Sequence, residues 1–128
     1  METKQLGRKV TLPEKPSIDI LDSFENPGAT EVIFKTNEFT SLCPVTGQPD
    51  WATITIVYRP RERCVESKSL KLYLQSFRNE KAFMEKLCSI IFYDLADFLA
   101  PRYLNVSVNA VPRGGLALEA KKEETWSN

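Results

Sequence analysis

The stretch Trp51-Ala52-Thr53-Ile54-Thr55-Ile56-Val57-Tyr58 alternates threonine with isoleucine through its centre. β-Branched side chains suit the pleated surface of a strand, and a period of two is the pattern of β-structure. Pro60 follows and ends the pattern, because proline cannot donate a hydrogen bond to a central ladder. We therefore predict a strand over residues 51–58.

A second strand pattern precedes this one along the chain. Glu31-Val32-Ile33-Phe34-Lys35 is a short apolar run, and proline and glycine occur in the segment that separates the two runs. We expect the two strands to pair in antiparallel fashion across that segment. Residues 1–30 are polar and rich in proline, and are predicted to form an N-terminal arm with one apolar patch, Ile18-Asp19-Ile20-Leu21.

Two helical patterns follow the strands. Residues 66–79 carry leucines among polar side chains, with Ser67 as a candidate N-cap. Residues 81–99 have apolar side chains at steps of three and four, which give a helix one apolar stripe: Phe83, Leu87, Ile90, Ile91, Leu95 and Phe98. Pro101 marks the end of this second helix.

The chain then returns to strand patterns. Residues 102–111 alternate apolar and polar side chains, Pro112-Arg113-Gly114-Gly115 is a turn, and residues 116–119 form a short last strand. Residues 121–128 are polar and are predicted to be a mobile tail. The order ββααββ predicts an α+β fold in which two helices cover one face of an antiparallel sheet. The predicted domain spans residues 31–120.

Length and composition are those of a single globular domain. The chain has 128 residues, with 17 Lys and Arg against 17 Asp and Glu. This neutral balance argues against nucleic acid as a partner, since nucleic acid needs a basic face. No apolar run is long enough to span a membrane, and the N-terminus lacks the apolar core of a signal peptide, so a cytoplasmic location without membrane partners is expected.

Cysteine and histidine usage limits the chemistry. The three cysteines, Cys43, Cys64 and Cys88, are widely spaced and are expected to be free thiols in a reducing compartment. The chain has no histidine, which removes the commonest general base and the commonest metal ligand. We therefore predict no metal site.

One segment carries a thiol and a carboxylate on a constrained loop: Phe39-Thr40-Ser41-Leu42-Cys43-Pro44-Val45-Thr46-Gly47-Gln48-Pro49-Asp50. A thiolate is a strong nucleophile, but a free cysteine has a pKa of about 8.5 and needs assistance at neutral pH. A hairpin loop returns its ends to one place, so Asp50 is expected close to Cys43. Cys43 is a candidate nucleophile and Asp50 a candidate proton donor. The alternatives are a small buried residue and a turn cap.

Charged side chains elsewhere indicate a possible ligand site. Lys68 and Lys71 are three residues apart on one helix face, where they could hold phosphate near a helix start or form a solvated face. Arg113 precedes two glycines that would let backbone approach a ligand, although a simple turn explains the same pattern. Glu85, beside Met84, could accept paired hydrogen bonds from a guanine-like base, or be an ordinary surface glutamate.

Taken together, these segments resemble the family of NADPH-dependent 7-cyano-7-deazaguanine reductases, the nitrile reductases of queuosine biosynthesis. The resemblance covers about residues 39–115. It rests on the Cys43 segment and on Glu66-Ser67-Lys68-Ser69-Leu70-Lys71-Leu72-Tyr73, Ser76-Phe77-Arg78-Asn79 and Pro112-Arg113-Gly114-Gly115. The length is that of the short, single-module branch of the family.

The resemblance implies the tunnelling fold, in which ββααββ subunits join their sheets into a ring. It further implies a homo-oligomer, a decamer of two stacked pentamers, with active sites between subunits. The sequence periodicity agrees with the subunit fold, but does not by itself predict the ring.

The resemblance also implies a reaction. Cys43 would add to the nitrile carbon of 7-cyano-7-deazaguanine as a covalent thioimide, and Asp50 would give a proton to the nitrile nitrogen. NADPH would deliver hydride twice, giving 7-aminomethyl-7-deazaguanine. The residues implied to bind the substrate are Val65, Glu66, Ser67, Met84 and Glu85. Those implied to hold the cofactor phosphates are Lys68, Lys71 and Arg113.

One position departs from the family pattern. The family usually has histidine immediately before the glutamate that matches Glu85, and this chain has Met84 there. Turnover rate and pH profile are the properties that this departure would affect.

Three other functions fit parts of the pattern. An amidinotransferase relative would form a similar thioimide but take ammonia, and Lys68 and Lys71 favour the reductase over it. A pterin-type cyclohydrolase of the same fold would need a zinc site, which a chain without histidine cannot readily build. A catalytically silent module that binds a purine-like ligand is the third alternative, because a fold does not determine a function.

Overall fold

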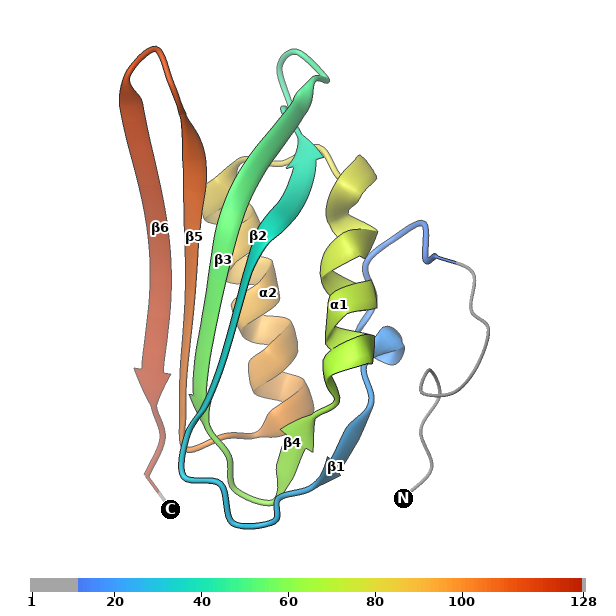
Figure 1. Ribbon diagram of the computed structural model, residues 1–128, viewed down its shortest axis with the longest axis vertical. Helices are drawn as coiled ribbons and strands as arrows, with labels where there is room; N and C mark the ends of the chain where they lie inside the picture. The colour runs from blue at the N-terminus through green and yellow to red at the C-terminus, as the bar shows by residue number, and fades with distance from the viewer. Residues whose placement is uncertain (1–11, 128) are drawn as a thin grey trace.

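The computed structural model describes residues 12–127, and its four long strands and two α-helices follow the ββααββ order predicted from the sequence. The principal sheet is antiparallel throughout (Figure 1). Its strands, in spatial order, are β2 (Val32–Leu42), β3 (Pro49–Arg59), β5 (Tyr103–Arg113) and β6 (Leu116–Thr125). Helices α1 (Ser67–Gln75) and α2 (Met84–Leu99) come between β3 and β5 in the chain. The predicted α+β class is confirmed.

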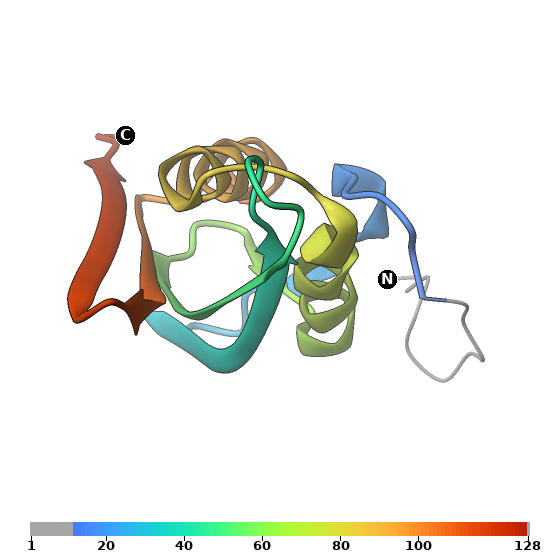
Figure 2. The same cartoon turned by 90° about the horizontal axis from the view of Figure 1, so that it is seen from above.

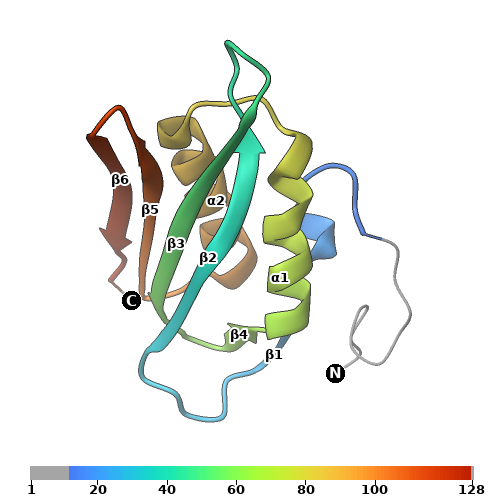
Figure 3. The same ribbon diagram turned by 45° about the horizontal axis from the view of Figure 1, so that its top comes forward.

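Both helices lie on the same side of the principal sheet (Figure 2). The residues of β3 that face them are at most 1% exposed, because apolar side chains occupy every second position: Ala52, Ile54, Ile56 and Tyr58. α2 packs over β5 and β6, whereas α1 lies beside the edge strand β2 (Figure 3). In the predicted stripe of α2, Leu87, Ile91 and Leu95 are completely buried. Burial of each such side chain contributes about 1.5–3 kcal/mol.

The predicted N-terminal arm contains regular structure that the sequence pattern does not indicate. β1 (Ser23–Glu25) pairs in antiparallel fashion with β4 (Arg63–Val65), and a 3-10 helix spans Ile18–Ile20. Ile20 and Leu21 belong to the hydrophobic core, so this part of the arm packs on the domain. Three-residue strands are too short to show a period, and this is why they were not predicted.

The last strand is longer than predicted, and the mobile tail predicted from residue 121 is wrong as far as Thr125. Residues 121–125 continue the ladder with β5 up to the pair Thr125↔Tyr103. Trp126 then stacks on Phe92 of α2, with 6.0 Å between ring centroids. β6 is an edge strand that is mostly exposed, so its polar far half gives no alternation that sequence analysis could detect.

The first long strand also extends beyond its prediction. β2 spans Val32–Leu42 instead of residues 31–35, with an irregularity in its pairing between Thr36 and Phe39. Polar residues at this irregularity interrupt the apolar pattern. The remaining loop is correspondingly short and consists of residues 43–48.

The helix boundaries differ from their predictions because other groups terminate or cap the helices. Glu66, and not Ser67, is the N-cap of α1. The predicted helix over residues 66–79 turns into a 3-10 helix at Ser76–Asn79. α2 begins at Met84 instead of residue 81, since Lys81 forms a bridge to Leu42 of β2.

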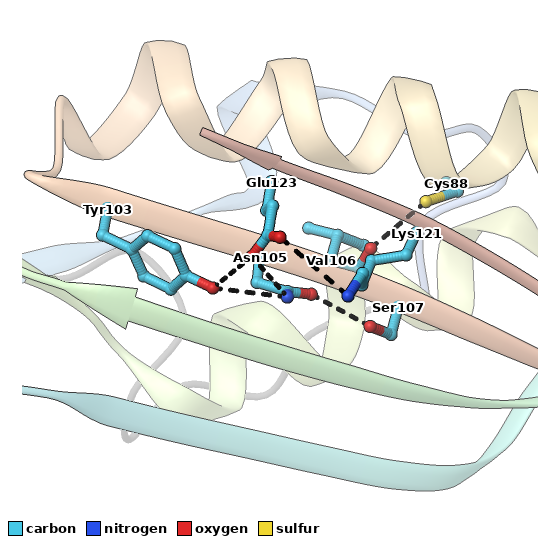
Figure 4. A network of polar contacts seen from close by, with 7 residues as sticks. All are labelled: Cys88, Tyr103, Asn105, Val106, Ser107, Lys121 and Glu123. Atoms are coloured by element: carbon cyan, nitrogen blue, oxygen red, sulfur yellow. Dashed lines mark hydrogen bonds and ion pairs between the residues drawn. The ribbon is translucent and has the colours of Figure 1, made fainter. Parts of the chain in front are cut away.

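The face of β5 away from the helices is polar over residues 103–107. Figure 4 shows Tyr103, Asn105 and Ser107 of β5 beside Glu123 of β6. The Tyr103 hydroxyl donates to Glu123 Oε2 at 2.7 Å, and this hydrogen bond lowers the pKa of Glu123 and raises the pKa of Tyr103. Cys88 of α2 lies on the other face and donates to a β5 carbonyl at 3.3 Å, and burial raises the pKa of its thiol.

The predicted free thiols are confirmed for all three cysteines. Within residues 12–127, no helix is long and apolar enough to cross a membrane. The same residues contain no group of three or more His, Cys, Asp or Glu side chains that could hold a metal ion.

Candidate active site

Cys43 is half-buried at the end of β2, at the start of a tight loop. The loop is closed by two main-chain hydrogen bonds: Cys43 N donates to the Gln48 carbonyl at 2.8 Å, and Gly47 N donates to the Cys43 carbonyl at 2.9 Å. Gly47 has a φ of +72°, a left-handed conformation that glycine adopts without strain. Cys43 therefore lies on a closed turn, as the proline and glycine of the segment predict.

The loop also activates the Cys43 thiol. A hydrogen bond from the Thr46 side chain, together with those from the backbone N–H groups of Thr46 and Val45, lowers the pKa of Cys43 below its ordinary value. Weaker contributions oppose this shift, namely partial burial and the charge of Asp50. Hydrogen-bond donors that point at sulfur stabilise the thiolate, which is the nucleophilic form.

Asp50 lies inside β3, directly opposite Ser41 of β2, and not in the loop as predicted. Its Oδ1 forms an ion pair with Arg113 Nη2 at 2.7 Å, and the same nitrogen donates to the Pro49 carbonyl at 2.8 Å. Three strands thus bring Cys43, Asp50 and Arg113 to one end of the sheet. The predicted contact of Arg113 with cofactor phosphate stays a prediction.

The start of α2 lies at this same end. Leu42 N donates to the Glu80 carbonyl at 2.9 Å, and Ala82 N donates to the Leu42 carbonyl at 3.3 Å, so residues 80–82 run beside the end of β2. Glu85 in the first turn of α2 is exposed. Met84 is 6% exposed and belongs to the hydrophobic core, so it faces the protein interior and not solvent.

Residues 65–67, predicted to line a base pocket, lie where β4 ends and α1 begins, at the opposite end of the sheet (Figure 1). Val65 N donates to the Tyr58 hydroxyl at 3.0 Å, and Tyr58 is eight residues along β3 from Asp50. A strand rises about 3.3 Å per residue, so about 26 Å of strand separates these two ends. One chain does not bring residues 65–67 to Cys43.

Glu66 already has a partner within its own chain. It is 8% exposed and caps α1, because Oε2 accepts from Lys68 N at 2.7 Å and Oε1 accepts from Ser69 N at 2.9 Å. Val65 is buried in the core, whereas Ser67 is exposed at the first position of the helix.

A cleft of about 570 Å³ lies between β2 and α1. Ser67 and Lys71 line it, and none of Cys43, Asp50 and Arg113 does. Its walls are largely apolar, and its other cationic residues are Lys35 and Arg78. Lys68 is half-buried and does not line the cleft.

Two residues at the Cys43 end were not predicted. Thr46 supplies the hydroxyl that lowers the Cys43 pKa, and its Oγ1 also accepts from Gln48 N at 3.2 Å. This second contact is an ordinary threonine turn and would have indicated Thr46 as an ordered loop residue. Ser41 is fully buried opposite Asp50, and only the strand register reveals this.

Comparison with known proteins connects this arrangement with one family. A family model described as "QueF-like protein" matches residues 49–127. The NADPH-dependent 7-cyano-7-deazaguanine reductase of Paracoccus denitrificans (strain Pd 1222) is 51% identical over 119 residues, which cover 91% of this chain and 77% of that protein. The protein of the same name from Bacillus subtilis (strain 168) is 52% identical over 104 residues, or 79% of this chain and 63% of that protein.

A solved structure shares the fold. The apo form of the archaeosine synthase QueF-Like has a TM-score of 0.72 at 22% identity, covering 79% of this chain and 99% of that one. At this level of identity the likeness supports the fold alone. The family model matches more than half of the chain, and the relatives at about half identity cover most of it. The chain therefore belongs to the QueF-like family of NADPH-dependent 7-cyano-7-deazaguanine reductases.

Proposed function

We propose that this protein reduces the nitrile of 7-cyano-7-deazaguanine to the aminomethyl group of 7-aminomethyl-7-deazaguanine, with NADPH as reductant, in queuosine biosynthesis. The observation that carries the proposal is the identity of 51% to a reductase of that name over 91% of the chain. The Cys43 end of the sheet supports the same reaction, since it holds both a thiol with a lowered pKa, Cys43, and a carboxylate, Asp50.

The chain's own residues account for the first step. Cys43 Sγ forms a bond to the nitrile carbon, and Asp50 moves the thiol proton to the nitrile nitrogen. The product is a neutral covalent thioimide, and the proton count does not change. A nitrile is a weak electrophile, and its protonation during attack avoids a free anion on nitrogen.

NADPH supplies two hydride equivalents, which with two protons convert the carbon–nitrogen triple bond into an amine. During this reduction the bond between Cys43 Sγ and carbon breaks, and the thiol is restored. The chain binds and orients the substrate, excludes water, and holds the proton at Asp50.

The residues of the cleft fit a dinucleotide phosphate. Lys35, Lys71 and Arg78 give the cleft cationic groups, and its largely apolar walls include Trp51. A volume of about 570 Å³ is within the range of small-molecule sites. Lys71 is exposed and Lys68 lies in the same first turns of α1, so both can approach a ligand from outside the chain.

The two separated ends support a site assembled from two copies of the chain. β2 and β6 are the edge strands of the principal sheet, and β6 exposes Leu116 (77%) and Leu118 (38%). Long edge strands with apolar side chains are suited to pairing with another chain. A ring of copies, proposed here as a decamer of two pentamers, would bring the Cys43 end of one copy to the α1 end of the next.

The amidinotransferase, the zinc cyclohydrolase and the silent binding module receive less support. The archaeosine synthase shares the fold at 22% identity, whereas the relatives at about half identity are named as reductases. A cytoplasmic location is also proposed, because an unpaired thiol nucleophile needs a reducing compartment.

Intact-mass spectrometry tests the proposed function. The purified protein mixed with the nitrile alone should gain the mass of one substrate per chain, and added NADPH should be consumed at two equivalents per nitrile. Cys43→Ala should abolish both results, and Cys64→Ala, which alters a buried thiol, should preserve both. Substrate-dependent oxidation of NADPH by Cys43→Ala would contradict the mechanism. An adduct without reduction would favour the transferase or the silent module.

A further inference from the structure

Ser41 is a completely buried polar residue whose hydroxyl has no hydrogen-bond partner within residues 12–127. An unpaired buried hydroxyl reduces stability, and buried polar groups in proteins are nearly always paired. Such a group is explained when it finds its partner in another state of the protein, for example with a ligand bound.

The register places Ser41 directly opposite Asp50. The next pair along the same face, Phe39↔Ala52, is buried on the helix side of the sheet, so Ser41 and Asp50 share that face. Directly opposed residues of an antiparallel pair have their Cβ atoms about 4.5–5.5 Å apart, which a hydroxyl and a carboxylate can bridge. Ser41 is also two residues before Cys43 in the chain.

The Asp50 carboxylate is held from one side only. Arg113, whose side chain is 58% exposed, contacts Oδ1 from the solvent side, and the Asp50 side chain is 22% exposed. Within the described residues no hydrogen bond is made to Oδ2. A free donor at Ser41 and a free acceptor on Asp50 therefore lie opposite each other across β2 and β3.

We propose that Ser41 is a positioning residue for Asp50, and that its hydroxyl donates to Asp50 Oδ2 while the nitrile is attacked. The inference rests on the proposed function. Ser41 keeps its own proton: Asp50 receives the proton of the Cys43 thiol and passes it to the nitrile nitrogen. Arg113 on the solvent side and Ser41 on the core side together fix the carboxyl plane during that transfer.

The test compares wild type with Ser41→Ala, using the rate of Cys43 adduct formation without NADPH at several nitrile concentrations. This design separates the apparent Kd of the nitrile from the maximal rate. Ser76→Ala is the matched control, because Ser76 is equally buried but its hydroxyl donates to the Tyr73 carbonyl. Melting temperature is measured for all three proteins.

We expect Ser41→Ala to lower the maximal rate by about tenfold, because one hydrogen bond to a charged group is lost. The apparent Kd of the nitrile should stay within about twofold of the wild-type value. Its melting temperature should equal or exceed that of wild type, because an unpaired polar atom is removed. Ser76→Ala should show the opposite pattern, with a lower melting temperature and an unchanged rate.

Wild-type adduct formation keeps the two proposals distinct. Failure of wild type to form the adduct would refute the proposed function itself. Adduct formation by Ser41→Ala at the wild-type maximal rate would overturn the role of Ser41 alone. If Ser41→Ala loses both stability and rate, Ser41→Thr decides: recovery of the rate by the retained hydroxyl supports the role, and no recovery in a folded protein overturns it.

Discussion

Arg113 Nη2 lies 2.7 Å from Asp50 Oδ1, so the cation implied to bind cofactor phosphate is paired with the implied proton donor. The two residues are 63 positions apart in the chain and meet because β3 and β5 are neighbours in the sheet. The same guanidinium donates to the Pro49 carbonyl at 2.8 Å, which fixes its approach. In this protein Arg113 therefore orients Asp50 whether or not it also contacts a cofactor.

Replacement of Arg113 by alanine should slow adduct formation in the absence of NADPH. We expect the rate of adduct formation to decrease by about three- to tenfold. The variant loses a hydrogen bond between two charged groups, but solvent partly screens the ion pair between Arg113 and Asp50, which limits the effect. The free energy of unfolding should change by less than about 1 kcal/mol, which denaturant titration would show. Arg113→Lys is the control, since it keeps the charge and loses the fork geometry. A variant that forms adduct at the wild-type rate, with only its KM for NADPH raised, would show that the Asp50 contact is dispensable.

The Cys43 thiol should react with iodoacetamide with a pH midpoint below that of an ordinary cysteine. The hydrogen bonds from Thr46 and Val45 lower its pKa, so the thiolate fraction at neutral pH is increased. Thr46→Val removes the largest of these contributions and should move the midpoint upward, whereas Thr46→Ser should leave it near the wild-type position. Mass-resolved alkylation distinguishes Cys43 from the buried Cys64 and Cys88. Equal midpoints for Thr46→Val and wild type would contradict the role of the loop.

The elements that sequence analysis predicted well are those whose buried face repeats along the chain. Ile54 and Ile56 alternate with threonine, and Leu87, Ile91 and Leu95 recur at helical steps, so both patterns are local. Residues 121–125 are polar on both faces and become a strand only because β5 offers them a ladder. That information is not present in the segment itself.

The candidate site was predictable to a similar extent. The loop position of Cys43 followed from nearby proline and glycine, but the hydrogen bonds from Thr46 and the position of Asp50 inside β3 did not. The separation of Glu66 from Cys43 depends on the length of the strands and the direction of α1, which no motif encodes. Motif spacing thus gives the chemistry of each segment, whereas tertiary structure decides which segments meet.

Met84→His, which introduces the residue that the family resemblance implies at this position, should destabilise this protein in a pH-dependent manner. Met84 is 6% exposed, so burial would hold the pKa of the introduced imidazole below its unfolded value of about 6.5. Because the pKa of this imidazole is lower in the folded protein than in the unfolded protein, unfolding takes up a proton, and the folded state becomes less stable as the pH falls. The difference in melting temperature between Met84→His and wild type should therefore grow as the pH is lowered from about 8 to about 5.5. Met84→Leu controls for packing and should show a difference that does not vary with pH. A constant difference for Met84→His would mean that the imidazole reaches solvent.

Two variants that each lose activity when NADPH is limiting should regain activity together if the site is shared between copies. Cys43→Ala removes the nucleophile at one end of the sheet, and Lys71→Glu reverses a cation of the cleft beside α1, where it should greatly raise the KM for NADPH. When the two variants are co-refolded in equal amounts, some sites combine an intact Cys43 from one copy with an intact Lys71 from its neighbour. With random assembly of equal amounts, about one quarter of all sites have both residues intact, so about a quarter of the wild-type rate is expected.

The control mixture combines Cys43→Ala with Asp50→Asn, two changes at the same end of the same chain. A shared site takes both residues from one copy, because Asp50 is close enough to Cys43 for its charge to act on the thiol. No random mixture of these two variants creates an intact site, and the rate should stay at background. Recovery in the control mixture, or none in the first, would contradict the arrangement in which the Cys43 end of one copy faces the α1 end of the next. The cleft that holds Lys71 is lined by none of Cys43, Asp50 and Arg113, so the first mixture is the measurement that decides whether the thiol and this cation reach one site from different copies.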